Sequence, residues 1–119
     1  MIITINEIPP SNNEYMGNSR SFHLYRREKD RWHLLVRAAI SERPKEPYKK
    51  AAVSLLYFFP DRHRRDPDNY SGKFILDALV REGILADDNF DVITLTVQKG
   101  GVDRKQPHTV VEIKEQTND

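Results

Sequence analysis

The sequence predicts an α+β fold, with two helices packed on one mixed sheet and the elements in the order β-α-β-α-β-β. Two observations lead to this fold class: strand-like runs alternate with helical periodicity, and clusters of turn-forming residues separate them. A chain of 119 residues is long enough for one hydrophobic core. We therefore expect a single domain that spans residues 1–119.

The strand-like runs are short and rich in aliphatic and aromatic residues, and prolines end the first two at Pro9 and Pro60. Four runs are predicted as strands, at residues 1–8, 53–59, 92–97 and 108–115. The connections carry Pro, Gly, Asn, Ser or dense charge, and are predicted as loops at residues 9–21, 41–50, 61–69 and 98–107.

Two segments show helical periodicity. In residues 22–40 the apolar positions recur at i, i+3, i+4, i+7 and i+8, which predicts one buried face made of Trp32, Leu35, Val36, Ala39 and Ile40. Basic residues occupy the rest of this helix. A second helix is expected to begin near Asn69, to bury Phe74, Ile75, Ala78 and Leu79, and to end at a left-handed Gly83.

Composition excludes several classes of site. The chain has no cysteine, so it has no disulfide framework, thiolate metal site or cysteine nucleophile. Its four histidines lie too far apart for the usual zinc spacings. No segment resembles a signal peptide or approaches the length of a membrane span, which predicts a cytoplasmic protein with no membrane contact.

The net charge of +1 hides an asymmetry along the chain. Residues 1–65 hold 13 Lys or Arg against 7 Asp or Glu, whereas residues 66–119 hold 6 against 11. The counts alone favour charges that segregate by chance on solvated faces, and the alternative is a basic surface that docks a polyanion beside an acidic site.

The switch in charge falls within RRDPDN, residues 64–69, which sets Asp66 and Asp68 one residue apart behind two arginines. Pro67 favours extended backbone at Asp66, so both carboxylates are expected on one side. Two carboxylates about 4 Å apart repel by about 4 kcal/mol at an effective dielectric near 20, and Mg²⁺ is a natural occupant between them. Alternatively, Asp68 or Asn69 caps the second helix, or the arginines neutralise the acids.

Two further residues add to this pattern. A helix of about 14 residues is roughly 20 Å long, and about six extended residues cover the same distance. The chain after Gly83 can therefore return Asp87 or Asp88 to the first two acids, while Lys73 lies one turn past Asp68. Three acids, a lysine and a basic loop are the parts of metal-assisted phosphodiester cleavage, in which metal activates water and the cations hold phosphate.

Four blocks of the sequence together resemble the RusA family of Holliday-junction resolvases, which are small endodeoxyribonucleases. These blocks are PPSNN at 9–13, PDRHRRDPDN at 60–69, LDAL at 76–79 and the acidic pair at 87–88. The resemblance implies that Asp66, Asp68 and Asp88 are catalytic and bind metal. It implies that Lys73 is the catalytic lysine, although Lys73 follows the second acid by five residues and the family's lysine follows by four.

The resemblance also implies the ligands and partners. The substrate would be four-way junction DNA in the nucleoid, cut by paired symmetric nicks with Mg²⁺ or Mn²⁺, by a homodimer that needs no nucleotide cofactor. The residues expected to contact this DNA are Arg62, Arg64, Arg65, Asn69 and Asn13.

Three other functions remain open at this point. A nuclease of the same fold could act on flaps, forks or duplex. A DNA-binding module without catalysis could use the basic helix and loop for phosphate contacts. A structural domain could carry an ion-pair network at residues 62–68.

Overall fold

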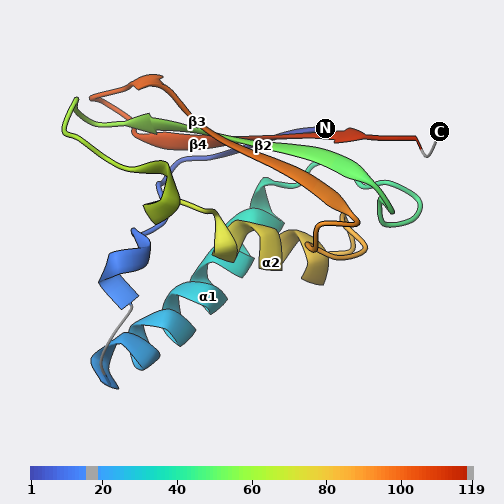
Figure 1. The fold of residues 1–119 in the computed structure, drawn as a ribbon, viewed down its shortest axis with the longest axis horizontal. Coiled ribbons are helices and arrows are strands. Elements are labelled where there is room, and N and C mark those ends of the chain that lie inside the picture. The colour runs from blue at the N-terminus through green and yellow to red at the C-terminus, as the bar shows by residue number, and fades with distance from the viewer. Residues whose placement is uncertain (16–18, 118–119) are drawn as a thin grey trace.

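The computed structural model describes residues 1–15 and 19–117. It has a four-stranded mixed sheet with two α-helices on one face, as Figure 1 shows, so the predicted single α+β domain is confirmed. The strands are β1 (Ile2–Ile5), β2 (Ala51–Phe59), β3 (Ile93–Val102) and β4 (His108–Glu115). The helices are α1 (Ser19–Ala39) and α2 (Lys73–Arg81), with short 3₁₀ helices η1 (Asn12–Tyr15) and η2 (Pro67–Asn69).

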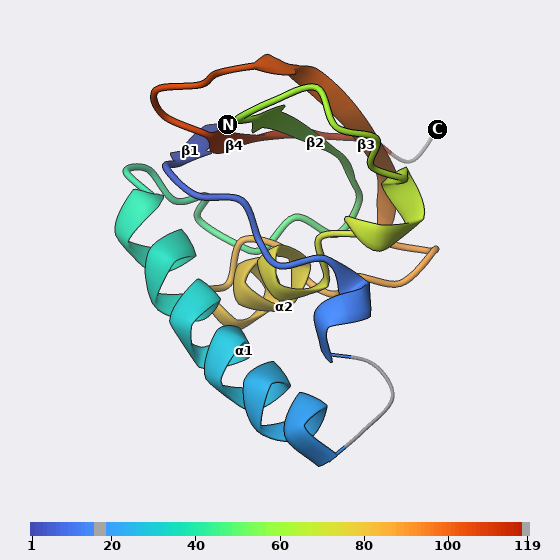
Figure 2. The same ribbon diagram turned by 90° about the vertical axis from the view of Figure 1, so that its left-hand side faces the viewer.

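The sheet has the strand order β1-β4-β2-β3. Central β2 pairs antiparallel with β4 and parallel with β3, while β1 pairs antiparallel with β4. Parallel neighbours need a crossover, and the chain from β2 through α2 to β3 supplies it. Figure 2 shows α1 and α2 on the same side of the sheet, so the two described α-helices cover one sheet face.

The core lies between the helices and the covered face of the sheet. Every second residue of β2 is buried, which is the alternation expected of a strand with one face in the core. These β2 residues pack with buried residues of α1, α2 and β4. The largest fully buried side chains include Trp32, Val36, Leu55, Tyr57, Ile75, Leu79, Val111 and Ile113.

The predicted strands and helices are largely confirmed, and β4 has the predicted bounds. The segment 9–21 is a correction: it was predicted as a loop, but it contains η1 and the first turn of α1. Residues 16–18 of that segment lie outside the described part of the chain. The backbone N–H of Glu14 closes the η1 turn on the Ser11 carbonyl at 3.0 Å, so turn-forming residues here form a short helix.

Two further boundaries differ from expectation. Helix α2 begins at Lys73 instead of near Asn69, because Pro67–Asn69 form a separate turn and Gly72 adopts a left-handed φ of 75°. Strand β3 continues to Val102 through a glycine pair that was predicted as a loop. The pairing with β2 extends that far because a β-bulge shifts the register between Tyr57 and Phe58. The glycines have no side chain and so leave room for the Phe58 ring.

Glu82 joins the two helices to the 41–50 connection. Arg43 donates hydrogen bonds to the Glu82 carbonyl at 2.7 Å and to Glu82 Oε1 at 2.8 Å, while His33 of α1 hydrogen-bonds Oε2. The bond from Arg43 to the Glu82 carboxylate and, second, the bond with His33 hold the pKa of Glu82 below its ordinary value. These contacts of the Glu82 carboxylate therefore stabilise the fold at neutral pH, and the stabilisation is lost as pH falls through the lowered pKa of Glu82.

Among the residues that the structure describes, no helix combines the length and apolar character needed to span a membrane.

Gly72 and Gly83 provide a matched test of the packing between β2 and the start of α2. Both have φ of 75°, but a Cβ at Gly72 would overlap Leu55 Cδ1, whereas nothing lies within 4 Å of a Cβ at Gly83. Gly83→Ala should cost roughly 1–2 kcal/mol of unfolding free energy for left-handed backbone. Gly72→Ala should cost about 1–3 kcal/mol more, because it overpacks a core side chain. Urea denaturation of both variants measures the difference, and equal losses would contradict this packing.

Candidate functional site

The segment between β2 and α2, residues 60–72, contains most of the predicted site residues, and we call it the 60–72 loop. Side chains of β2 that point toward the core hold this loop in place. The Tyr57 hydroxyl donates a hydrogen bond to the Tyr70 carbonyl at 2.9 Å, and the Phe59 and Tyr70 rings meet edge to face at 5.2 Å. Both β2 residues are buried, so the loop is held against a rigid surface.

Arg65 fastens the first half of the loop. Its guanidinium lies 4.4 Å from the Phe59 ring centroid, forms a 2.8 Å ion pair with Asp61, and donates to the Asp61 and His63 carbonyls. Its side chain is only 20% exposed. The backbone N–H of His63 and, second, Arg65 hold the pKa of Asp61 below its ordinary value. Arg65 was predicted to contact DNA, but in the structure most of its donors are used within the loop.

Asp66 and Asp68 have different backbone settings. Asp66 is extended, with φ of −99° and ψ of 135°, as the following proline predicts. The expectation of an extended stretch through Asp68 is wrong, because the N–H groups of Asn69 and Tyr70 bond back to the Asp66 and Pro67 carbonyls and close a 3₁₀ turn. Neither acid caps this turn with its side chain.

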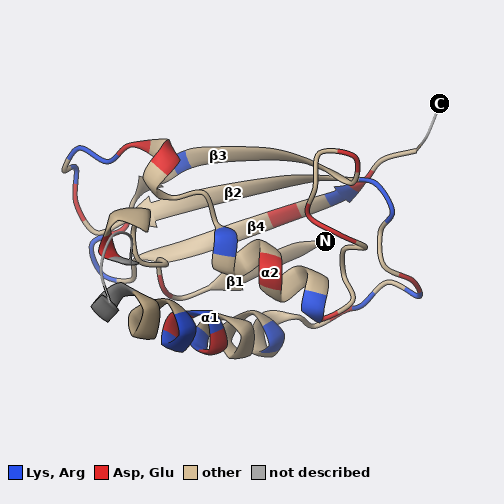
Figure 3. Cartoon of the chain, turned by 60° about the horizontal axis from the view of Figure 1, so that its bottom comes forward, with Lys and Arg blue, Asp and Glu red and all other residues tan. Residues whose placement is uncertain are grey.

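Both of these carboxylates are open to solvent. Arg64 Nε lies 3.4 Å from Asp66 Oδ1, and the Asp66 side chain is half exposed. Asp68 is exposed, and its carboxylate has no hydrogen bond or ion pair with any other described residue. Figure 3 shows the resulting order of acidic, basic and acidic segments along the loop after β2. The site therefore presents free carboxylate oxygens next to cations.

A distant segment supports the second acid. Asn12 Nδ2 donates to the Asp68 carbonyl at 2.9 Å and to Ser71 Oγ at 3.3 Å, across more than 50 residues of chain. Asn13, which was predicted to contact DNA, is exposed beside it, and Asn69 is partly buried. Asn12 thus fixes the backbone that carries Asp68.

Lys73 is the first residue of α2, and its Nζ lies 5.1 Å from the Tyr25 ring centroid. Asp88 lies beyond α2 and lines a separate hollow with Leu76 and Phe90. Within residues 1–15 and 19–117, no group of three or more His, Asp or Glu side chains could hold a metal ion. The structure therefore does not assemble Asp88 with Asp66 and Asp68 in such a group.

The route of the chain after Gly83 explains the position of Asp88. The N–H of Tyr48 bonds to the Ile84 carbonyl and the N–H of Ala86 bonds to the Tyr48 carbonyl, both at 2.9 Å, so the chain is held against the 41–50 connection. The side-chain oxygen of Asn89 then accepts hydrogen bonds from the N–H groups of Asp91 and Val92, and its carbonyl accepts from Val92 and Ile93, which turns the chain into β3. Tyr48 thus fixes the path of residues 84–86, and over the described residues Asp88 is not grouped with the first two acids as a metal site.

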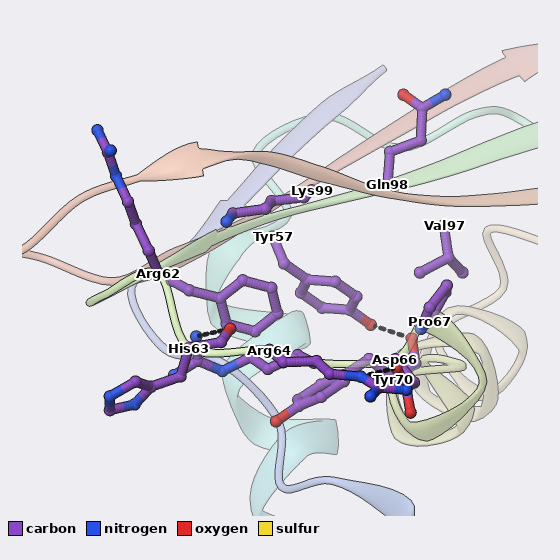
Figure 4. A pocket seen from close by; sticks show the side chains of 12 residues that line it. Tyr57, Arg62, His63, Arg64, Asp66, Pro67, Tyr70, Val97, Gln98 and Lys99 are labelled. Carbon is purple, nitrogen blue, oxygen red and sulfur yellow. Dashed lines mark hydrogen bonds and ion pairs between the residues drawn. The ribbon is translucent and has the colours of Figure 1, made fainter.

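A cavity of about 270 Å³ opens between the 60–72 loop and β3. Figure 4 shows Lys99 and the Tyr57 ring on its strand side, with Arg64 along the loop toward Asp66. The lining residues are Tyr57, Phe59, Arg62, His63, Arg64, Arg65, Asp66, Pro67, Tyr70, Val97, Gln98 and Lys99. Sequence reasoning missed Lys99, whose only signal would have been the extension of β3 through residues predicted as a loop.

The structure thus gathers most of the predicted site on one segment. Arg62, Arg64, Arg65, Asp66, Asp68, Asn69 and Lys73 follow one another between β2 and the first turn of α2. Asn13 adjoins this segment through Asn12, and Asp88 lies apart from the acids in its own hollow. The sequence matches no protein-family model and no curated protein.

Arg65 and Arg64 differ in role and allow a paired test. Arg65→Lys removes a planar group that stacks and bonds at several points, and should lower the free energy of unfolding by about 1–2 kcal/mol. Arg64→Lys, at a side chain that is 89% exposed, should change it by less than about 0.5 kcal/mol. Urea denaturation measures both values. Equal effects would show that Arg65 does not fasten the loop.

Proposed function

We propose that this protein is a metal-dependent endonuclease that resolves four-way DNA junctions. One observation carries the proposal: two solvent-open carboxylates, at Asp66 and Asp68, are held on an anchored loop beside a cavity lined by cations. A protein that only binds DNA gains nothing from acids that face phosphates, because like charges repel. The resemblance of the sequence blocks to the RusA family supports the choice of junction DNA as substrate.

The donor chemistry fits a magnesium ion. Mg²⁺ prefers oxygen ligands, and it commonly binds through one or two carboxylates together with waters and substrate phosphate. Asp66 and Asp68 would supply those carboxylates, since Asp68 has no competing partner among the described residues and Asp66 has only the 3.4 Å contact with Arg64. Bound there, the ion would activate water and shield the leaving oxygen. Asp88 is a third ligand only by the resemblance, since it forms no metal-binding group with these two acids among the described residues.

The other residues of the site would bind and orient the phosphate. Arg62 and Arg64 are exposed at the mouth of the cavity and would attract the DNA backbone. Lys73 lies at the N-terminus of α2, where the helix dipole also favours an anion. Asn12 would keep Asp68 in place through the carbonyl it bonds. We further propose that the protein acts as a homodimer in the cytoplasm, so that two sites cut one junction.

A second candidate is a DNA-binding module without catalysis. The position of Asp88 in a separate hollow favours it, because that position leaves the carboxylates of Asp66 and Asp68 as a pair. Such a module would use the same cations for phosphate contacts, and its binding would fall steeply with salt.

Cleavage of a labelled mobile four-way junction tests the proposal, with linear duplex of the same sequence as comparison and Mg²⁺ or chelator present. Wild-type protein should make paired nicks in the junction with Mg²⁺ only. Asp68→Asn should lower the cleavage rate by about 100-fold or more, as expected when a group that acts electrostatically in the transition state is lost. Asp30→Asn, at an exposed position of α1, should cleave as the wild type does.

Three outcomes would overturn all or part of this proposal. Equal nicking of linear duplex would keep the metal chemistry and move the substrate to other DNA. Junction binding without nicks under any divalent metal would favour the binding module. Equal cleavage by Asp68→Asn and Asp30→Asn would remove Asp68 from the catalytic site.

A further inference from the structure

The cavity beside the 60–72 loop has both an aromatic interior and a cationic mouth, and we propose that it receives one unpaired nucleotide. The base would enter between the loop and β3, and its phosphate would stay at the mouth. This inference rests on the proposed function insofar as the nucleotide belongs to branched DNA. It adds a binding site for the base and assigns Lys99 of β3 to it.

The size of the cavity limits what can enter. Its volume of about 270 Å³ lies just below the roughly 300–1,000 Å³ that suits drug-sized ligands, so it has room for one small flat group. The anchored loop closes one side and β3 closes the other. A base that remains paired and stacked in a duplex cannot reach such a space, and proteins that take up a base must first move it out of the stack.

The interior suits a base. The Tyr57 and Phe59 rings lie 5.8 Å apart and are buried at the back of the cavity. Tyr70, which is partly exposed, packs against both at 5.7 and 5.2 Å and is the ring that a base could reach. Pro67 and Val97 add apolar surface on the side of the loop and of β3. Aromatic and apolar surfaces bind bases without strong sequence preference, since every base has a flat π face. Inorganic phosphate alone would gain no binding energy from this apolar lining.

The mouth has uncompensated positive charge. Arg65 is paired with Asp61, and Arg64 lies next to Asp66. Arg62 and Lys99 line the same cavity, and neither forms an ion pair with another residue in the described ranges. Two cations that line the same cavity, without carboxylate partners, favour an anionic group near its mouth.

Strand pairing places Lys99 at this position. Lys99 lies opposite Tyr57 in the parallel β2–β3 register, directly before the β-bulge at the glycine pair. Its side chain therefore leaves β3 on the face where the Tyr57 ring lies, as Figure 4 shows. Lys99 is exposed, which leaves its ammonium group accessible to ligand.

A nucleotide site of this kind would favour DNA with unpaired or weakly paired bases. Extracting a base from a duplex costs a few kcal/mol, and the cost is least where the base is already unpaired. Bases at a branch point meet this condition more readily than bases within an arm. The cavity would thus add preference for branched over linear DNA without reading sequence.

The test uses a small ligand without metal, so that it does not depend on cleavage. Thymidine 3′,5′-bisphosphate and the matching abasic deoxyribose bisphosphate are titrated into the full chain in chelator at low salt, with backbone amide NMR shifts as the readout. Binding should shift the amides of residues 64–70 and 97–99. The base should tighten binding by about 5- to 150-fold over the abasic ligand, the range expected for stacking of one base.

Two matched variants test the contribution of Lys99 to binding. Lys99→Gln should weaken binding of the thymidine bisphosphate by about threefold or more, as expected for loss of a charged contact. Lys105→Gln removes the same charge from an exposed position in the β3–β4 connection and should leave affinity unchanged. Equal affinity for the two ligands, equal effects of the two variants, or shifts confined to other residues would each overturn the proposal.

The two proposals can fail separately. Tight binding of the thymidine ligand, with no nicking of junctions by the wild-type protein, would keep the nucleotide site and remove the nuclease function. Junction cleavage that depends on Asp68, with equal binding of both small ligands, would keep the nuclease and remove the nucleotide site.

Discussion

The position of the whole candidate site depends on one face of β2. Pairing with β3 and β4 on either side fixes this strand, so its alternate side chains point into the core in a set register. Three of them each hold one part of the 60–72 loop: Leu55 packs beside Gly72, Tyr57 bonds to Tyr70, and Phe59 stacks with Arg65. Ordering a residue costs about 1–2 kcal/mol of backbone entropy, and these anchors help to offset that cost for a charged surface loop.

The same anchoring explains how acids and arginines share RRDPDN. Each charged group has its own partner or direction. Arg65 turns inward to Phe59 and Asp61, Arg64 extends along the loop to Asp66, and the Asp68 carboxylate is exposed on a 3₁₀ turn that Asn12 supports. The Asp66 side chain is half exposed and that of Asp68 is exposed. The acids are therefore available for a divalent cation, which is the basis of the proposed chemistry.

Sequence periodicity was sufficient for the parts of the fold that depend on local patterns. The buried stripe through Trp32 and Val36, the strand at 53–59 and the left-handed Gly83 were all expected and are present. Features set by distant segments could not be predicted this way. The bond from Asn12 to Asp68 spans 56 residues, the path of residues 84–86 depends on Tyr48, and the place of Lys99 depends on a bulged pairing with β2. The grouping of the first acids with the arginines was predictable because they are adjacent in sequence, whereas that of Asp88 depended on the tertiary path.

The anchoring of the loop by β2 is most directly tested by hydrogen exchange of the Tyr57→Phe variant, which removes only the hydroxyl that bonds to Tyr70. The amides of Asn69 and Tyr70 close the 3₁₀ turn and report its stability. Loss of one hydrogen bond of about 0.5–1.5 kcal/mol should speed their exchange by about two- to tenfold, while amides of the β2–β4 pairing keep their wild-type rates. Unchanged exchange at Asn69 and Tyr70, or an equal increase across the whole chain, would contradict the claim that β2 holds the site in place.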